Sequence, residues 1–206
     1  MAKILEKTER RLGEKLFIKG ARCAGPKCAL VRKSNPPGIH GKKRRRGLSE
    51  YGQLLKEKQK VRFLYGLDDK DIARYSREAV QKSGLFSDVL ITSLESRLDN
   101  VVYRLGFAES RRQSRQLVGH GHVTVNGRTL SIPSYQLKKN DQISLKDRSL
   151  SGPIFENLTE KLKKYEPPKW LGLDKDKKVG TVMGKPELDS MEISADIMKI
   201  KEFYSR

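Results

Sequence analysis

The chain has 206 residues, with 44 lysines and arginines against 25 acidic side chains, which gives a formal net charge of +19. Self-repulsion raises the energy of such a chain when it is compact, and a polyanionic partner (nucleic acid, an anionic membrane or an acidic protein) relieves it. The length suits one or two domains. No run approaches the roughly 18 consecutive apolar residues of a membrane-spanning helix, which argues against a membrane protein.

The cysteines and the N-terminus bear on the compartment. Cys23 and Cys28 are the only cysteines, too few for a disulfide framework. Residues 1–15 contain acids and no apolar stretch, unlike a signal or transit peptide. We therefore expect a cytoplasmic protein.

The first predicted segment, residues 1–47, is a basic arm rich in glycine and proline. Residues 1–50 contain 15 basic and 4 acidic side chains, a net charge of +11, which is more than half of the total excess. Residues 33–47 read as a loop. Five consecutive cations lie in this loop: Lys42, Lys43, Arg44, Arg45 and Arg46. A solvated charge run or a targeting tag is the alternative, but phosphate neutralisation explains such a run better.

Helical periodicity begins after this arm. Ser49 can cap a helix that ends at Gly66, and Lys56 and Lys60, four residues apart, give this helix a basic stripe and are candidate RNA contacts. Further helices are predicted over residues 69–83 and 87–105 from the spacing of their apolar residues.

A short helix with a basic start follows. Ser110 and Gln113 match a capping box for a helix through residue 118. Arg111 and Arg115 share one face of this helix and Arg112 flanks them. Cations at a helix N-terminus do not complement the helix dipole, so we expect them to bind a ligand such as phosphate. An ordinary exposed helix face is the alternative.

The period then changes from 3.6 to 2. Asn126-Gly127 is a two-residue hairpin turn that follows Val123 and Val125, and Leu130 and Ile132 are expected to continue the return strand. The basic helix, the turn with His120 and His122, and the hairpin with Asn126 and Arg128 together suit recognition of structured RNA by shape and phosphates.

Three further elements are predicted with less support from their patterns. Leu137 and residues 143–145 suggest another strand pair, and residues 153–165 an amphipathic helix. In the tail, apolar Met198 and Ile200 alternate with lysines, which suggests an edge strand.

The predicted fold is α+β: a mainly helical N-terminal domain and an RNA-binding module of two short helices and a small antiparallel β-sheet. The domain bounds are 1–90, joined by the tail 195–206, and 91–194, with the core of the module at 94–146.

No catalytic or cofactor-binding motif is present. The sequence has three histidines, and its glycines match neither a phosphate-binding loop nor a dinucleotide fingerprint. Cys23 and Cys28 would need two more ligands to hold zinc, and the only upstream pair is Glu6 and Glu9. We therefore expect two buried or free thiols, no metal, no cofactor and no small-molecule substrate.

Long motifs identify a family resemblance. The segment 94–141, LESRLDNVVYRLGFAESRRQSRQLVGHGHVTVNGRTLSIPSYQLKKND, closely resembles the RNA-binding module named after bacterial ribosomal protein S-four. PPGIHG, KKRRR and GLSEYGQLLKEKQKVRFLYG in residues 36–66, and the terminal EFYSR, resemble the rest of that small-subunit ribosomal protein family. The module also occurs in RNA-modifying enzymes, so an enzyme or a free regulatory RNA-binding protein is the alternative.

The resemblance implies a non-enzymatic protein of the small ribosomal subunit. It would bind small-subunit rRNA and nucleate assembly of the body. It would also lie beside ribosomal proteins S-three and S-five at the channel through which mRNA enters, and influence decoding accuracy. Some members hold zinc with two cysteine pairs, of which only the second remains here.

The resemblance also assigns residues to these roles. The mRNA channel loop is 42–46 and the edge facing neighbouring proteins is 197–204. The RNA face of the module is Arg97, Arg111, Arg112, Arg115, His120, His122 and Asn126. The protein-facing residues are Ile197, Lys199, Lys201, Phe203 and Tyr204.

Overall fold

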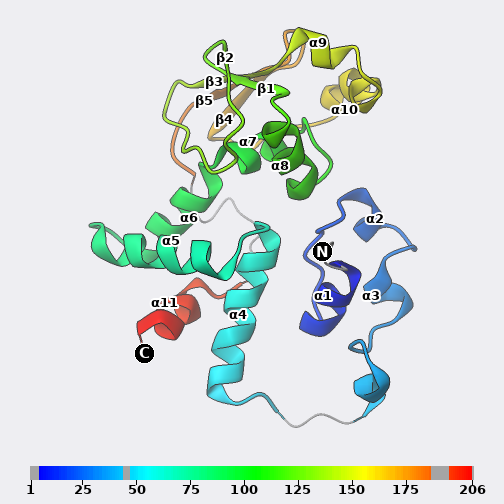
Figure 1. The fold of residues 1–206 in the computed structure, drawn as a ribbon, viewed down its shortest axis with the longest axis vertical. Coiled ribbons are helices and arrows are strands. Elements are labelled where there is room, and N and C mark those ends of the chain that lie inside the picture. Colours follow the sequence, from blue (N-terminus) through cyan, green and yellow to red (C-terminus); the bar gives the residue numbers. More distant parts are fainter. Residues whose placement is uncertain (1–4, 44–46, 187–194, 206) are drawn as a thin grey trace. The chain divides into compact units, whose positions relative to one another are not determined.

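The computed structural model describes residues 5–43, 47–186 and 195–205. The chain divides into two compact units (Figure 1). We call Met1–Ser87 with Ile193–Arg206 the helical unit, and Asp88–Glu192 the sheet unit. An α+β fold is confirmed, because helices and one antiparallel sheet are both present. None of the described helices combines the length and hydrophobicity that a membrane crossing requires.

The helical unit is built around α4 (Glu50–Leu64) and α5 (Asp69–Gln81). The Ser49 hydroxyl accepts the Gly52 N–H at 3.2 Å, which confirms the predicted cap. Gly66 follows α4 with a φ of 64°, a left-handed conformation that ends a helix at little cost. The shorter helices of the arm are α1 (Leu5–Leu12), α2 (Ala21–Ala24), α3 (Ala29–Arg32) and the 3-10 helix η1 (Ile39–Lys42).

The tail is a helix, α11 (Ile197–Ser205), so the prediction of an edge strand is wrong. The Asp196 carboxylate accepts the N–H groups of Met198 at 3.0 Å and Lys199 at 3.3 Å, as an N-cap does. Ile197 and Ile200 lie three residues apart and are both buried, with α11 packed on α4 and α5. Helical spacing therefore determines which side chains reach the core.

The predicted helix 87–105 is two helices, α6 (Phe86–Glu95) and α7 (Leu98–Arg104). Arg97 between them is extended (φ −66°, ψ 139°) and forms a bridge with Gln136. The Leu98 N–H donates to the Tyr135 carbonyl at 2.9 Å, and the Leu137 N–H to the Ser96 carbonyl at 2.9 Å. This pairing breaks the helix, and it also replaces the strand pair expected at Leu137.

The sheet has five antiparallel strands in the order β2-β1-β3-β5-β4. Asn126 (φ 50°) and Gly127 (φ 78°) form the predicted hairpin turn. The return strand ends at Thr129, so the expectation that it continues through Leu130 and Ile132 is wrong. The strands are β1 (Val123–Val125), β2 (Arg128–Thr129), β3 (Gln142–Leu145), β4 (Leu171–Asp174) and β5 (Val179–Val182).

One face of this sheet packs on α7 and α8 (Arg111–Gly119) (Figure 1). Val123 pairs with Leu145 and Val125 with Ile143, so all four apolar side chains lie on the core face. A Cβ added at Gly180 would lie 2.3 Å from Leu105 Cδ1, so β5 and α7 meet closely. Two pieces replace the helix predicted at 153–165: the 3-10 helix η2 (Pro153–Phe155) and α10 (Leu158–Lys163), preceded by α9 (Asp147–Leu150).

Candidate RNA-binding surface

The start of α8 is held by side chains, as the capping box predicts. The Ser110 hydroxyl accepts the Gln113 N–H at 3.3 Å. The side-chain amide oxygen of Gln113 accepts the Glu109 N–H at 2.8 Å, one residue before the position that a standard capping box uses. These two hydrogen bonds fix the first turn of α8. They therefore also fix the directions in which the side chains of that turn point.

Arg111 points inward, toward two buried polar residues. Its Nε donates to Asn100 Oδ1 at 2.7 Å, and a terminal nitrogen lies 3.7 Å from Glu95 Oε1. Glu95 is fully buried, and it also accepts two hydrogen bonds of 3.0 Å from Arg104. The guanidinium of Arg111 further lies 4.7 Å from the centre of the Tyr103 ring. The predicted phosphate contact at Arg111 therefore needs correction, because this side chain stabilises the module itself.

A second buried acid, Asp99, faces the next turn of α8. Arg97 holds Asp99 with two hydrogen bonds of 3.0 and 2.7 Å, and its own side chain is only 2% exposed. Its head group is thus not available to RNA in this conformation, contrary to expectation. Arg115 approaches the same carboxylate at 4.0 Å but keeps 43% of its side chain exposed. Glu95 and Asp99 are four residues apart, as are Arg111 and Arg115, so the two pairs match.

Two further cations of the module are exposed. Arg112 is exposed, and no partner for it is found among the described residues. Arg128 on β2 is exposed as well, whereas the Asn126 amide is engaged with Asp141 and with the Gln142 N–H, both at 2.9 Å. Asn126 thus connects the hairpin turn to the start of β3. The candidate RNA surface of the sheet unit consists of Arg112, Arg115, His120 and Arg128.

The turn after α8 sets the positions of the two histidines. The N–H groups of Gly121 and His122 donate to the carbonyls of Val118 and Leu117 at 2.9 and 3.1 Å, and Gly121 has a φ of 72°. This is a Schellman motif, which ends α8 and turns the chain back into β1. The His122 ring is bound to the Ser149 hydroxyl at 2.9 Å, whereas His120 is exposed.

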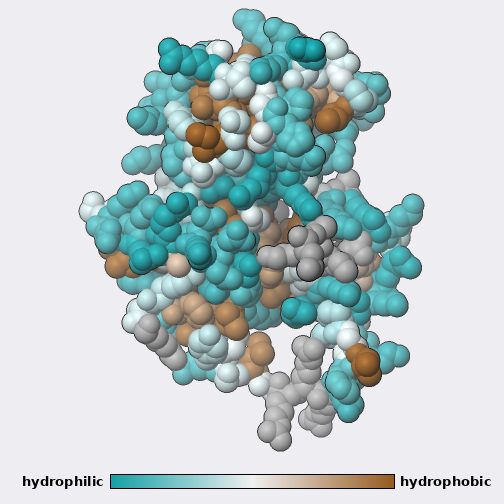
Figure 2. Space-filling view, viewed as in Figure 1, coloured by the Kyte–Doolittle hydropathy of each residue, from teal (hydrophilic) through white to brown (hydrophobic). Residues whose placement is uncertain are grey.

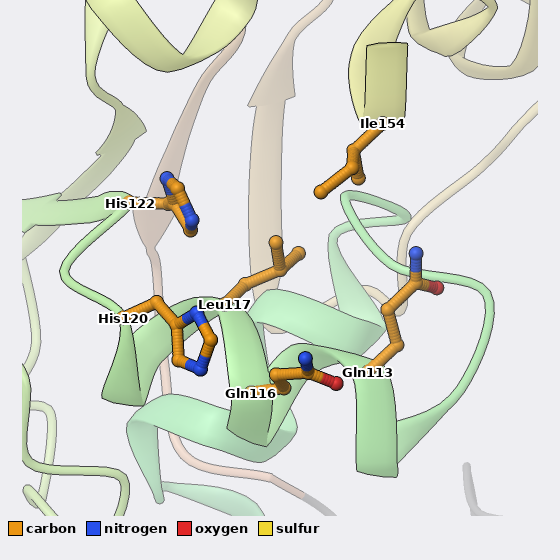
Figure 3. Close-up of a pocket in the computed structure, with 6 residues that line it drawn as sticks. All are labelled: Gln113, Gln116, Leu117, His120, His122 and Ile154. Atoms are coloured by element: carbon orange, nitrogen blue, oxygen red, sulfur yellow. The ribbon is translucent and has the colours of Figure 1, made fainter. Parts of the chain in front are cut away.

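A small hollow opens beside α8, which the sequence analysis did not predict. Its volume is about 130 Å³. Figure 3 shows its six lining side chains arranged around the opening: Gln113, Gln116, Leu117, His120, His122 and Ile154. The spacing of Gln113, Gln116 and His120 on one side of α8 is the signal that could have indicated it.

The predicted basic residues of the helical unit have different surroundings. Lys42 and Lys43 are exposed at the end of η1, while Arg44, Arg45 and Arg46 lie outside the described residues. Lys60 is buried, with its ammonium 2.8 Å from both Glu14 and Glu57.

Glu14 joins this lysine to Lys56, which lies 3.0 Å away. Burial alone would raise the pKa of Glu14, but hydrogen bonds from Lys60 and Lys56 lower it below its ordinary value. Lys60 is therefore a structural residue rather than the RNA contact expected, and Lys56 is partly engaged in the same cluster.

Of the residues expected to face neighbouring proteins, some are likewise buried and others reach solvent. Ile197 lies on the buried face of α11, so it cannot serve as a contact, and this expectation is corrected. Lys201 is exposed, whereas Lys199 is half-buried with its ammonium 3.8 Å from Asp196. Phe203 stacks on Tyr51 with ring centres 5.6 Å apart and also contacts Tyr204 at 5.2 Å.

The two cysteines are poor candidates for a zinc site. Both are free and buried. Burial raises the pKa of the Cys23 thiol, and the nearby Glu9 carboxylate contributes to the rise, whereas zinc binds the thiolate. Glu9 is itself buried and accepts the N–H groups of Leu16 at 3.1 Å and Ile18 at 3.3 Å. These carboxylate oxygens already organise the loop, so the described residues do not fit the metal that the resemblance suggests.

Comparison with known proteins identifies the family. A family model described as S4 domain matches residues 96–143, and one described as Ribosomal protein S4/S9 N-terminal domain matches residues 5–95. The chain is 45% identical to the small ribosomal subunit protein uS4 of Syntrophomonas wolfei, 44% to that of Thermus thermophilus and 46% to that of Caldicellulosiruptor bescii. Each alignment covers 96% of this chain and 94% of the relative. The chain therefore belongs to the family of small ribosomal subunit protein uS4, a family of ribosomal proteins rather than enzymes.

Proposed function

We propose that this chain is a structural constituent of the small ribosomal subunit that binds the rRNA directly. Family membership over nearly the full length supports the role. The observation that carries the RNA-binding surface is the arrangement of α8, where Arg112 and Arg115 are exposed on a helix anchored by buried acids. Guanidinium groups make paired, planar hydrogen bonds to phosphate oxygens, and a fixed helix reduces the entropy lost on binding.

The electrostatics of the chain agree with this role. A net charge of +19 favours association with a polyanion, and the cations that reach solvent determine how strongly phosphates are bound. On the face that Figure 2 shows, hydrophilic residues cover most of each unit, and hydrophobic ones lie in small separate groups. This side therefore offers no broad apolar face of the kind that an amphipathic membrane binder needs.

The direct test is binding to rRNA. Purified chain should bind a small-subunit rRNA junction fragment in a filter assay, and the protein should sediment with the small subunit in a sucrose gradient of a lysate. Sedimentation only with free protein, together with no preference for rRNA over an unrelated structured RNA, would contradict the proposal. A free regulatory RNA-binding protein would likewise sediment apart from the small subunit.

We further propose roles for the helical unit. The run 42–46 lies at the channel through which mRNA enters, and the exposed part of α11 faces ribosomal proteins S-three and S-five, through which the chain influences decoding accuracy. Support comes from the resemblance and from the exposure of Lys42, Lys43 and Lys201. Replacing 42–46 by alanine should slow unwinding of structured mRNA and leave assembly of the body largely intact. Loss of assembly would instead place this loop in the primary rRNA contact.

A further inference from the structure

We propose that the hollow beside α8 binds one unpaired nucleobase of the RNA, turned out of its stack. The inference rests on the proposed function and adds a base-binding site next to the phosphate-binding arginines. A base that has left its helix is the part of an RNA that proteins recognise most specifically, because both its face and its edge are then accessible.

The size of the hollow suits one flat group. Its volume of about 130 Å³ is several times the roughly 30 Å³ of a single water molecule in the liquid, so an organic ring can enter. It is well below the roughly 300–1,000 Å³ of pockets that enclose a whole small-molecule ligand. A free nucleotide or cofactor therefore gains too little contact here, whereas a base attached to a polymer bound by other contacts gains enough.

The lining offers surfaces for both ring faces. Buried Leu117 lies between the other side chains, and Ile154 points toward the opening from η2 although 57% of it is exposed (Figure 3). The rings of His120 and His122 are 6.1 Å apart at 35°. A base placed against Ile154 covers apolar surface that now contacts water, and it can stack on an imidazole.

The polar groups are placed to recognise an edge. The Gln113 oxygen is engaged with the Glu109 N–H, which leaves its NH₂ donors. Among the described residues, the Gln116 side chain has no hydrogen-bond partner. An amide has a hydrogen-bond donor and an acceptor side by side. The edge of every base has an acceptor and a donor that can pair with them. The site therefore recognises a base as such, through stacking and one amide.

Two of the lining side chains, Gln113 and His122, are already held by contacts within the protein. Gln113 is fixed by its bond to the Glu109 N–H, and His122 by Ser149 and by edge contact with the Phe155 ring, 6.5 Å away. The Schellman turn holds His122 over Leu117. Preorganisation of this kind lowers the entropy lost when a ligand binds.

The neighbouring residues connect the hollow to the candidate RNA surface. Arg112 and Arg115 are three residues apart on α8, and Gln113 and Gln116 form the adjacent row, about 100° further around the helix axis. A strand that places its phosphates on the arginine row therefore carries a base beside the glutamine row.

The test is an abasic scan of the rRNA fragment that the wild-type chain binds. For the wild type, removing the base at one unpaired nucleotide should weaken binding about tenfold, as loss of one stacked base does. The double variant Q116L/H120A should bind intact RNA about tenfold more weakly and no longer distinguish that abasic fragment. Both substituted residues are exposed, and Gln113 is left in place because it caps the loop. An unchanged melting temperature shows that the variant folds.

The matched control is Arg112→Ala, which should weaken binding to the intact and abasic fragments by the same factor. The inference is overturned if the double variant retains the full effect of every abasic position, or if it binds intact RNA as the wild type does. Insertion of a side chain from a neighbouring protein would give that second result. Failure of the proposed function is seen separately, as absence of wild-type binding to the intact fragment.

Discussion

Arg111 and Arg112 are adjacent in the sequence, yet the structure assigns them opposite effects on substitution by alanine. In Arg111→Ala, the buried Asn100 amide oxygen loses a hydrogen bond of 2.7 Å. Leaving a buried acceptor unsatisfied costs about 1–3 kcal/mol. Glu95 retains Arg104 and Asn100, so the larger penalty of a buried charge without partners does not arise. We expect the free energy of unfolding of the sheet unit to fall by about 1–3 kcal/mol.

Two comparisons bracket this value. Arg112→Ala removes an exposed side chain and should change stability by less than about 0.5 kcal/mol. Arg104→Ala removes both hydrogen bonds of 3.0 Å to fully buried Glu95 and should be the worst of the three, at about 3–5 kcal/mol. The expected order of destabilisation is therefore Arg104, Arg111, Arg112.

Thermal melting and RNA binding, measured on the same three variants, decide the question. For a unit of this size, 1 kcal/mol lowers the melting temperature by roughly 4–8 °C. Arg112→Ala should melt like the wild type and lose about tenfold in rRNA affinity, since one charge-assisted hydrogen bond contributes about 1.5–3 kcal/mol and exposure reduces it. An Arg111→Ala protein with the wild-type melt and reduced affinity would refute the assignment of Arg111 to the interior network.

Three further outcomes are expected. The logarithm of the rRNA association constant should fall by several units per unit of log salt, at roughly 0.7–0.9 for each phosphate contacted, and a slope near zero in filter binding would contradict the phosphate model. Metal analysis of the purified chain should find no zinc. If it finds one equivalent of zinc, and the Cys23→Ser variant lacks that zinc, then Glu9 does not exclude the metal. Burial raises the pKa of Tyr204 to about 12, against about 10 for tyrosine in an unfolded chain. The stability from neutral Tyr204 is therefore present below pH 10 and lost as pH approaches 12, a dependence that an alkaline titration of Tyr204→Phe should lack.

Local signals predicted much of the fold. The caps at Ser49 and Ser110 and the turn Asn126-Gly127 act through atoms a few residues away, so their geometry follows from short stretches of sequence. The helices that they start and the hairpin are found where expected. Strands β4 and β5 were missed because they are short, four residues each, and gain stability only by pairing, β5 with β3 and β4 with β5.

One error arises where a distant segment determines the local structure, and another where a local signal was missed. The helix break at Arg97 depends on pairing with Gln136, and nothing near Arg97 in the sequence indicates this partner. Apolar spacing continues across the break because Leu94 and Leu98 both reach the core, so periodicity alone predicts one helix. In the tail, four alternating residues favoured a strand, while Asp196 marked the start of a helix and was overlooked.

The residue types of the candidate site could be predicted from the sequence, but the directions in which their side chains point could not. Lys60 and Arg111 were predicted to contact RNA, yet each is held by an acid from elsewhere in the chain, Glu14 and Glu95 respectively. Whether a cation faces solvent or a buried carboxylate depends on packing, which a single sequence does not show. The part of the prediction that the structure confirms is the presence of the basic helix α8 as a whole.

The matched spacing of acids and arginines explains why this helix carries more cations than RNA binding needs. Glu95 and Asp99 are buried, and a buried carboxylate is tolerable only with charged or hydrogen-bonded partners. Arg104 and Arg97 supply those partners from the same segment of chain, and Arg111 and Arg115 supply them from α8. The same contacts fix the helix on which Arg112 lies, so the stability of the module and the orientation of the exposed arginine that we propose to bind phosphate have one physical origin. The positive charge that faces RNA is then set by the arginines that the acids leave exposed, not by the total number in the sequence.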